Sequence, residues 1–385
     1  MFMESVKQRN PKLIQAAIQL HQSGSILPDT YVLDLDMIKE NAEKIVEEAK
    51  NNHIELFFML KQIGRNPIVA KMLVEAGINH AVVVDFKEAQ VMMDNNVPIG
   101  NVGHLVQVPQ ALLKKIMTYG SKYMTVYSLE KLQSINIVAK EIGIKQKVLL
   151  RIVDEEDELY PGQYGGFTIS ELPAVISHFK ELEHIEISGI TSFPCFLYDS
   201  EEGYLKPTHN VETVHEAKKI LEKEGFHIKE LNMPSATSVY TLPFLKKIGG
   251  TQGEPGHALT GTTPMHAQKD LAEKPAMLYV SEVSHNFKEK AYLYGGGFYR
   301  RGHLENVLID DDGKQTETRI NPLDDENIDY YLEADTTQPV GATAIMAFRT
   351  QVFVTRSEVA LVSGIQKGVP ILEGIYDSQG KYLRG

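Results

Sequence analysis

The sequence has little cysteine and no excess of positive charge. Its single cysteine, Cys195, excludes an intrachain disulfide and a zinc site built on cysteines. Acidic residues outnumber basic ones, 51 Asp and Glu against 39 Lys and Arg, which gives a formal net charge of −12. That charge argues against a nucleic-acid partner and against an anionic membrane. No run of roughly 18 apolar residues occurs, and the opening stretch MFMESVKQRN lacks the apolar region of a secretory signal. We therefore expect a cytoplasmic protein.

Common ligand-binding motifs are missing as well. The chain has neither the phosphate loop G-x-x-x-x-G-K-[ST] nor a strand-borne G-x-G-x-x-G dinucleotide motif. It has no H-E-x-x-H and no other pair of histidines at metal-ligand spacing, so we expect no metal. With 385 residues, of which 43% are hydrophobic and 23% charged, the chain is an ordinary globular one with room for two domains.

A regular alternation of short apolar runs with helical patterns fills residues 31–265. Strand-like segments begin near residues 55, 80, 101, 123, 147, 187, 229 and 250. The helical segments between them have recognisable ends, with Pro67 and Gly77 bounding one, Pro109 and Gly120 another, and Ser128 and Gly143 a third. Eight such units favour a closed (β/α)8 barrel of the TIM type over an open sheet.

The pattern changes over residues 266–385. Alternating strands there surround turn signals such as Asp312-Gly313 and Gln379-Gly380, which predicts an antiparallel β domain. Residues 1–30 precede the barrel and are candidates to pack on this domain. The predicted fold class is therefore α/β, a barrel followed by an antiparallel β domain.

The segment ELFFMLKQIGRNP, residues 55–67, places Lys61 at the C-terminal end of the first barrel strand. Desolvating an amine is costly, and a surface lysine that reaches solvent is one explanation. The other is chemical, because barrel enzymes place reactive groups at the C-terminal ends of the strands. Loops after the seventh and eighth strands of a barrel often bind phosphate.

Two later segments have the composition of such phosphate loops. NMPSATSVYTLP offers the hydroxyl and N–H groups of Ser235, Thr237 and Ser238 at the start of a helix, and GEPGHALTG offers Gly256 for close approach of an anion. Taken singly, the first segment is equally well explained as a set of helix caps, and the second is equally well explained as a turn. Opposite Lys61, they form the layout that pyridoxal phosphate requires, an amine for its aldehyde and dipoles for its phosphate.

In this order the segments resemble the fold-type III pyridoxal-phosphate enzymes, the group of alanine racemase and the basic amino-acid decarboxylases, and most closely their YhfX-like branch. FFMLKQIGRNP is similar to the segment that carries the cofactor lysine, NMPSATSVYTLP to the phosphate loop, and GEPGHALTG occupies the place of the racemase Arg-Pro-Gly segment. The resemblance implies that pyridoxal 5'-phosphate is joined to Lys61 and that its site is lined by Ser235, Ala236, Thr237, Gly256 and His257.

The departures from alanine racemase concern the cofactor ring. Where that family has an arginine against the pyridine nitrogen, this chain has Glu254, as the decarboxylases do. A carboxylate there favours the protonated ring, a stronger electron sink. LLRIVDEEDELYPGQYGGF resembles the fifth strand of the decarboxylases, with Arg151 facing the cofactor. The decarboxylase histidine that stacks on the ring is absent from TSFPCF, and the decarboxylase Gly-Gly-Gly phosphate loop is absent too.

Two further side chains have open roles. Cys195 in TSFPCF is either a contact in the site or a buried structural thiol. His104 in NVGHLVQVP follows the third barrel strand and either points into the barrel or is a satisfied barrel histidine.

A racemase needs acid/base groups on both faces of the cofactor, because the proton leaves one face and returns from the other. Lys61 would serve one face, and the family takes a tyrosine from the partner subunit for the other. YLYGGGFY is the local match, with Tyr294 as the candidate and Tyr292 and His285 as fallbacks; a structural hairpin tyrosine is the alternative. The resemblance thus implies a homodimer with shared active sites.

The sequence as a whole predicts a pyridoxal-phosphate-dependent racemase or epimerase acting at Cα of a small amino acid. A decarboxylase or lyase of the same fold is the alternative that Glu254 and Arg151 favour. A non-catalytic carrier of the cofactor is the alternative from another class, against which the additional β domain argues.

Overall fold

The computed structural model describes residues 2–385, and the chain divides into two compact units. One, here called the barrel unit, contains residues 45–59 and 70–256. The other, here called the sheet unit, contains the described residues 2–44, 60–69 and 257–385. The chain passes between the units more than once, so neither is a single continuous segment.

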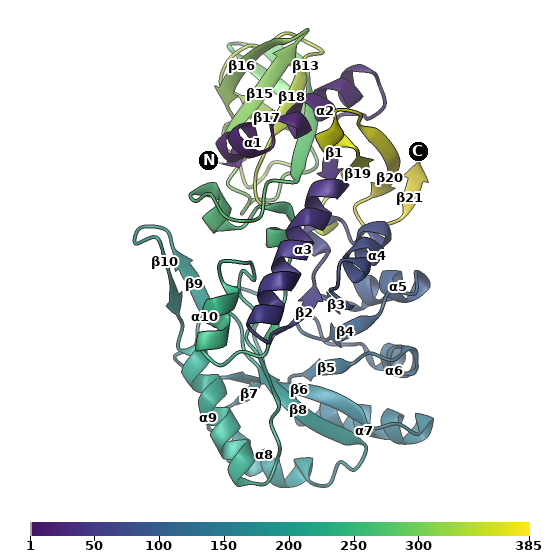
Figure 1. Cartoon of the computed structure of the whole chain (residues 1–385), viewed down its shortest axis with the longest axis vertical. Coiled ribbons are helices and arrows are strands. Elements are labelled where there is room, and N and C mark those ends of the chain that lie inside the picture. Colours follow the sequence, from purple (N-terminus) through teal and green to yellow (C-terminus); the bar gives the residue numbers. More distant parts are fainter. Residues whose placement is uncertain (1) are drawn as a thin grey trace. The chain divides into compact units, whose positions relative to one another are not determined.

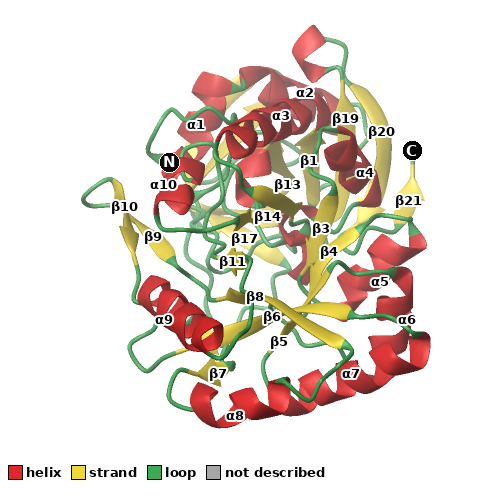
Figure 2. Ribbon diagram, turned by 60° about the horizontal axis from the view of Figure 1, so that its bottom comes forward, coloured by secondary structure: helices red, strands yellow, loops and turns green. Residues whose placement is uncertain are grey.

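The barrel unit is a closed ring of parallel strands (Figure 2). The sheet runs β5-β4-β3-β2-β12-β11-β8-β6-β7, and an additional pairing of β5 with β6 closes the ring and leaves β7 (Phe167–Thr168) outside it. This closure confirms the predicted (β/α)8 barrel, and each predicted strand region contains one strand of the ring. These strands are β2 (Glu55–Phe58), β3 (His80–Val83), β4 (Ile99–Val102), β5 (Tyr123–Val126), β6 (Gln146–Val153), β8 (Ile185–Thr191), β11 (Glu230–Asn232) and β12 (Gln252–Gly253).

Helices connect successive strands of the ring, and α3 (Leu35–Asn51) precedes the first. They are α4 (Pro67–Glu75), α5 (Phe86–Asp94), α6 (Leu113–Tyr119), α7 (Leu129–Ile142), α8 (Leu172–Phe179), α9 (Asn210–Lys223) and α10 (Leu242–Lys247). The helix ends follow local chemistry. The Ser128 hydroxyl accepts a hydrogen bond from the Lys131 N–H at the start of α7, and Gly143 ends that helix at a φ of 72°. A short hairpin, β9 (Phe196–Asp199) with β10 (Tyr204–Pro207), follows β8.

The barrel interior is closely packed. Phe57 of β2 is fully buried and belongs to a cluster with Val82, Tyr123 and Leu149. A Cβ at Gly100 of β4 would lie 2.2 Å from the Phe57 ring, so only glycine leaves room for this aromatic side chain. The Phe57 ring of β2 thus reaches across to β4, from which it is separated by β3 in the ring.

The sheet unit is built on a mostly antiparallel sheet in the order β16-β15-β18-β13-β1-β19-β20-β21, with β14 pairing β13 and β17. This arrangement confirms the predicted antiparallel β domain. Its strands are β1 (Thr30–Asp34), β13 (Met277–Phe287), β14 (Lys290–Tyr294), β15 (Asn306–Asp311), β16 (Lys314–Arg319), β17 (Tyr331–Ala334), β18 (Thr343–Met346), β19 (Glu358–Ser363), β20 (Ile371–Asp377) and β21 (Tyr382–Arg384). Helices α1 (Phe2–Arg9) and α2 (Pro11–Gln22) share an apolar core with this sheet (Figure 1).

Two details differ from what the sequence patterns suggest. Residues 31–34 fall within the predicted barrel range of 31–265, but β1 pairs antiparallel with β13 and parallel with β19 in the sheet unit. Strand β2 ends at Phe58, and Lys61 instead begins the short 3-10 helix η1 (Lys61–Ile63), which Gly64 ends at a φ of 79°. The predicted limits at residues 265 and 266 stay predictions. No helix within residues 2–385 is both long enough and apolar enough to cross a membrane.

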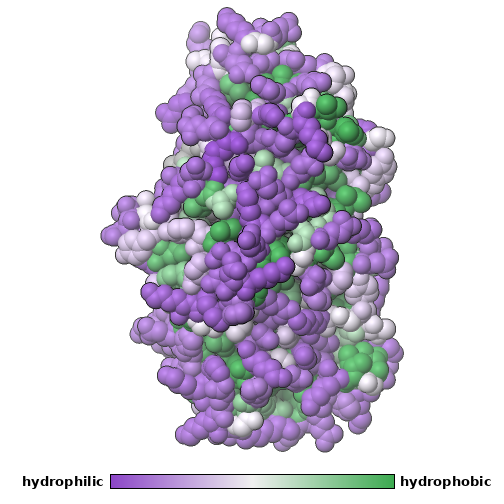
Figure 3. Space-filling view, viewed as in Figure 1, coloured by the Kyte–Doolittle hydropathy of each residue, from purple (hydrophilic) through white to green (hydrophobic). Residues whose placement is uncertain are grey.

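Figure 3 shows one face of the molecule, on which hydrophilic side chains predominate and hydrophobic ones form scattered small groups. Scattered apolar side chains of this kind are ordinary on protein surfaces. The apolar groups on this face therefore do not mark a binding site.

Candidate functional site

Glu254 is the central side chain at the C-terminal end of the barrel strands. It directly follows β12, and its Oε1 accepts a hydrogen bond from Asn232 Nδ2 at 3.0 Å. His104 Nε2 lies 3.7 Å from Glu254 Oε2, and the two side chains are only 2% and 1% exposed. The structure thus places His104 beside a buried carboxylate, which the Asn232 amide orients.

The loops after β11 and β12 are packed against each other. Thr237 Oγ1 accepts a hydrogen bond from the Glu254 N–H at 2.9 Å. A Cβ at Gly253 would lie 2.9 Å from Thr237 Cγ2, so this approach depends on glycine. The Ser235 hydroxyl accepts from the Cys195 N–H at 3.0 Å and donates to Pro234 O at 2.5 Å. Thr237 of the first phosphate-loop segment and Glu254 of the second therefore lie together in the barrel unit.

Arg151 supplies a buried cation on β6. Its Nε donates to Gly165 O at 3.0 Å, its Nη2 donates to Gln163 O at 2.9 Å, and the guanidinium lies 5.2 Å from the centre of the Tyr127 ring. The side chain is fully buried, yet Nη1 has no hydrogen-bond partner within residues 2–385. A buried cation with one unused donor is costly without a ligand, so this donor is available to an anionic or polar group.

Cys195 has the environment of a structural thiol. It is fully buried, its Sγ donates to Ser192 O at 3.2 Å, and burial raises the pKa of the thiol. A protonated, enclosed thiol is a poor nucleophile. These contacts favour the structural interpretation. Beside it, the ring of Phe193 lies edge-on to His104 with ring centres 6.0 Å apart.

Lys61 and His257 belong to the sheet unit. Arg349 Nε donates to His257 Nε2 at 3.2 Å, which makes that nitrogen an acceptor. His257 Nδ1 lies 3.3 Å from Thr262 Oγ1, to which it can then donate. Burial first, and then the charges of Arg349 and Lys61, lower the pKa of His257 well below its usual value, so the imidazole is neutral at pH 7. The predicted contact of His257 with a cofactor stays a prediction.

Tyr294, the first candidate for a second acid/base group, is exposed. It ends β14 and is 37% exposed. By contrast, Tyr292 donates its hydroxyl to Glu333 Oε2 at 2.8 Å and stacks on His285 with ring centres 4.9 Å apart. The two fallback residues are therefore occupied with each other and with a carboxylate.

Sequence reasoning did not single out Asn232 or Arg349. Asn232 ends β11 directly before the Ser235 loop, and this position at a strand end is a signal that could have identified it. Arg349 lies far along the chain from His257, in a segment with no motif, and only the fold brings the two together. Within residues 2–385, no group of three or more His, Cys, Asp or Glu side chains is arranged to hold a metal ion.

Comparisons with known proteins agree along the whole chain. Residues 33–264 match the family model described as alanine racemase, N-terminal domain, and residues 278–372 match the one described as YhfX-like, C-terminal domain. The uncharacterized protein YhfX of Escherichia coli strain K12 is 44% identical over 385 residues, which covers 100% of both chains.

Solved structures share the fold at low sequence identity. An alanine racemase of Clostridium difficile 630, in complex with cycloserine, has a TM-score of 0.64 and 20% identity, and the match covers 91% of this chain and 99% of that one. A D-threonine aldolase from Filomicrobium marinum has a TM-score of 0.66 and 14% identity, and the match covers 92% of this chain and 95% of that one. The family model spans more than half of this chain, and the YhfX relative spans all of it. The chain therefore belongs to the alanine racemase N-terminal domain family, with a YhfX-like C-terminal domain.

Proposed function

We propose that this chain is a pyridoxal-phosphate-dependent enzyme that acts at Cα of an amino acid, as a racemase or epimerase. The observation that carries the proposal is the environment of Glu254. Its carboxylate is almost fully buried, Asn232 fixes its orientation by a hydrogen bond, and His104 lies beside it. A carboxylate held in this way accepts a hydrogen bond from a protonated pyridine nitrogen and stabilises its charge.

The residues around Glu254 fit this cofactor. Arg151 has a buried donor, Nη1, available to it, and the two loops that contain Ser235, Ala236, Thr237 and Gly256 supply backbone and hydroxyl groups for a phosphate. Lys61 follows the strand β2, which pairs with β12 in parallel, so both strands end on the same side of the barrel. When bound, pyridoxal phosphate withdraws electrons from the substrate and makes a bond at Cα easier to break.

The acid/base work falls to the chain's own side chains. Lys61, once its amine is free, moves a proton at Cα on one face of the substrate. Tyr294 of the partner subunit moves a proton on the opposite face, so that two subunits complete each site in a homodimer. The exposure of Tyr294, at 37%, supports this role, because its hydroxyl is accessible to a second chain.

One observation favours a second candidate, a decarboxylase or lyase. Glu254 occupies the place of the arginine in alanine racemase, and a carboxylate there supports a stronger electron sink than racemisation needs. Among the proteins of the same fold is a D-threonine aldolase. A cofactor carrier without catalysis is the third candidate, and the large sheet unit argues against it.

The test measures deuterium uptake at Cα, and the products formed, in heavy water. The full chain, loaded with pyridoxal phosphate, is incubated in D₂O with the L- and D-forms of the common amino acids, one at a time. Deuterium at Cα together with loss of configuration supports a racemase. Release of carbon dioxide, or cleavage at Cβ, supports the second candidate. Absence of deuterium uptake and of any product for the whole panel would contradict the enzymatic proposal.

A further inference from the structure

Three polar side chains form a row in the barrel unit, one on each of three neighbouring strands. They are Thr191 of β8, Asn232 of β11 and Gln252 of β12, and all three are fully buried. Asn232 is the register partner of both Thr191 and Gln252 in the parallel pairing, which places the three side by side. The row reaches Glu254, which follows Gln252 by two residues along the chain.

Hydrogen bonds run along this row in one direction. Thr191 Oγ1 donates to Asn232 Oδ1 at 2.8 Å. Asn232 Nδ2 donates to Gln252 Oε1 at 3.2 Å and to Glu254 Oε1 at 3.0 Å, which uses both of its hydrogens. Because the oxygen of the Asn232 amide faces Thr191, the amide can present only N–H groups to the Glu254 carboxylate.

This direction leaves one buried donor unused. Gln252 presents its oxygen to Asn232, and its Nε2 has no hydrogen-bond partner within residues 2–385. An unpaired donor in a fully buried side chain is costly. Turning both amides over would give Gln252 Nε2 an acceptor, the oxygen of Asn232. A second arrangement of the same row is therefore available, and something must hold the observed one.

The two arrangements differ in the charge that they allow on Glu254. In the observed one, Asn232 donates to the carboxylate, which favours its ionised form. In the reversed one, the Asn232 oxygen would face Glu254, and two oxygens share a hydrogen bond only when one of them carries a proton. The Glu254 side chain is 1% exposed, so water cannot replace the lost N–H group. The direction of the row therefore sets the charge of Glu254.

Thr191 holds the row in its observed direction. Its hydroxyl proton is accepted by Asn232 Oδ1, and reversal would bring the N–H groups of Asn232 to that place instead. The Thr191 side chain is fully buried, so water cannot accept the proton in place of the amide oxygen. The influence of this hydroxyl on Glu254 passes through Asn232.

We propose that Thr191 is a positioning residue that keeps Glu254 ionised, because its hydroxyl fixes the orientation of the Asn232 amide. The inference rests on the proposed function for its catalytic meaning, since an ionised Glu254 is the partner proposed there for a protonated pyridine nitrogen. The charge of Glu254 itself can be measured without cofactor or substrate. His104 also faces this carboxylate, at 3.7 Å from Glu254 Oε2, and it stays unchanged in every variant compared below.

The test is a ¹³C NMR titration of the full chain, labelled at Cδ of its glutamates. The signal of Glu254 is the one missing from Glu254→Gln, and its chemical shift follows protonation of the carboxyl group. We expect Glu254 in Thr191→Val to take up its proton at least about one pH unit above wild type, a tenfold change in the acid–base equilibrium. Thr191→Ser keeps the hydroxyl, and Glu254 in that variant should titrate as in wild type.

Thr125→Val is the matched control. Thr125 of β5 donates to Asn101 Oδ1 of β4 at 2.9 Å, both side chains are buried, and β3 and β2 separate β4 from β12 in the ring. Each valine variant loses one buried hydrogen bond from threonine to asparagine, so both should unfold at a lower temperature than wild type. Only Thr191→Val should change the titration of Glu254. If Thr191→Val does not fold, Thr191→Ala carries the same expectation.

Four results would each overturn the inference. The first is a protonated Glu254 in wild type at pH 7.5. The second is the same titration in wild type and Thr191→Val, including a Glu254 that stays ionised in both down to about pH 4. The third is an equal shift in Thr191→Ser, which would exclude the hydroxyl as the cause. The fourth is an equal shift in Thr125→Val, which would make it a general effect of a lost hydrogen bond. Deuterium exchange at Cα tests the proposed function separately, so the two can fail independently.

Discussion

Replacing Glu254 with glutamine tests the role of the buried carboxylate. The change keeps the shape of the side chain, and an amide oxygen can still accept the hydrogen bond that Asn232 Nδ2 now donates at 3.0 Å. What is lost is the negative charge, at a position where the carboxylate and the neighbouring His104 side chain are 1% and 2% exposed. Water therefore screens this charge very little. Removing the charge should strongly slow exchange of the Cα proton.

The magnitude follows from the value of one charged hydrogen bond in such a site. Hydrogen bonds to a charged group contribute roughly 1.5–3 kcal/mol, and about 1.36 kcal/mol corresponds to a factor of ten in rate. We expect Glu254→Gln to slow exchange of the Cα proton by about a hundredfold, or about 2.7 kcal/mol. Cofactor binding should change much less, because Glu254→Gln leaves unchanged the backbone and hydroxyl groups of Ser235, Thr237 and Gly256 that are proposed to hold the phosphate.

The assay is the rate of deuterium uptake at Cα of the best amino-acid substrate, measured at saturating cofactor for wild type and variant. Glu230→Gln is the matched control. Glu230 begins β11 and accepts a hydrogen bond from Thr251 Oγ1 at 2.8 Å, at the opposite end of the strand that Asn232 ends. That variant should exchange at the wild-type rate. Equal exchange rates in wild type and Glu254→Gln would refute the reasoning about the carboxylate.

Four side chains give the remaining predictions. Borohydride treatment of the cofactor-loaded protein should label Lys61 and leave Lys61→Ala unlabelled; a label on another lysine would contradict the assignment. Mixing Lys61→Ala with Tyr294→Phe under subunit exchange should restore about a quarter of wild-type activity, since half of the random dimers keep one complete site of two, and no recovery would reject a shared site or Tyr294. Arg151→Met removes two charged hydrogen bonds and should lower the free energy of unfolding by about 2–4 kcal/mol in urea titrations, whereas Arg319→Met should change it by less than about 0.5 kcal/mol. Because burial raises the pKa of Asp29 to about 6 in the folded chain, its ionisation destabilises the fold progressively as pH rises from 4 towards 6 and beyond. Asp29→Asn should therefore have a free energy of unfolding about 1–3 kcal/mol higher than that of wild type at pH 7.5, and this difference should shrink towards pH 4. The same difference at pH 4 and at pH 7.5 would argue against the raised pKa.

The barrel itself could be predicted from the sequence. Strand periodicity, helix caps and glycine stops are local properties, fixed by residues a few positions apart, and the Ser128 cap and the Gly143 stop of α7 occur where the pattern predicts them. The positions of Lys61, Ser235 and Glu254 near strand ends follow from the same reading, because the ends of parallel strands meet on one side of a closed barrel. Their chemical roles rest on the resemblance to a family and stay predictions.

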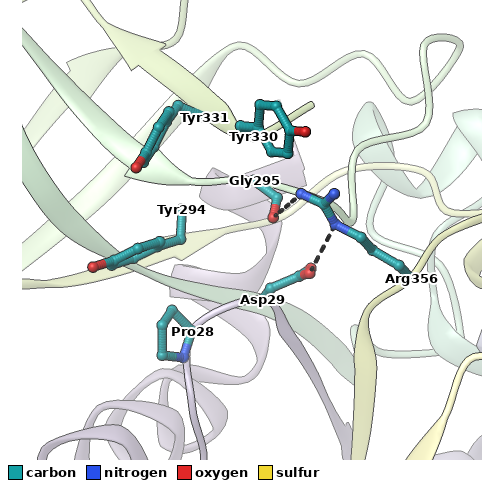
Figure 4. A pocket seen from close by; sticks show the side chains of 7 residues that line it. All are labelled: Pro28, Asp29, Tyr294, Gly295, Tyr330, Tyr331 and Arg356. Atoms are coloured by element: carbon teal, nitrogen blue, oxygen red, sulfur yellow. Dashed lines mark hydrogen bonds and ion pairs between the residues drawn. The ribbon is translucent and has the colours of Figure 1, made fainter. Parts of the chain in front are cut away.

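Only the tertiary structure decided which distant side chains meet. No periodicity connects Asp29 with Arg356 (Figure 4), or His257 with Arg349. Asp29 and Arg356 come just before β1 and β19, and the parallel pairing of these two strands brings them together. β1 pairs with β13 and β19 rather than opening the barrel, because pairing depends on which sheet can bury a strand and not on its position in the chain. Likewise, the glycine run after Tyr294 indicates close approach in the sequence, but the charged groups that approach it are visible only once the sheet is formed.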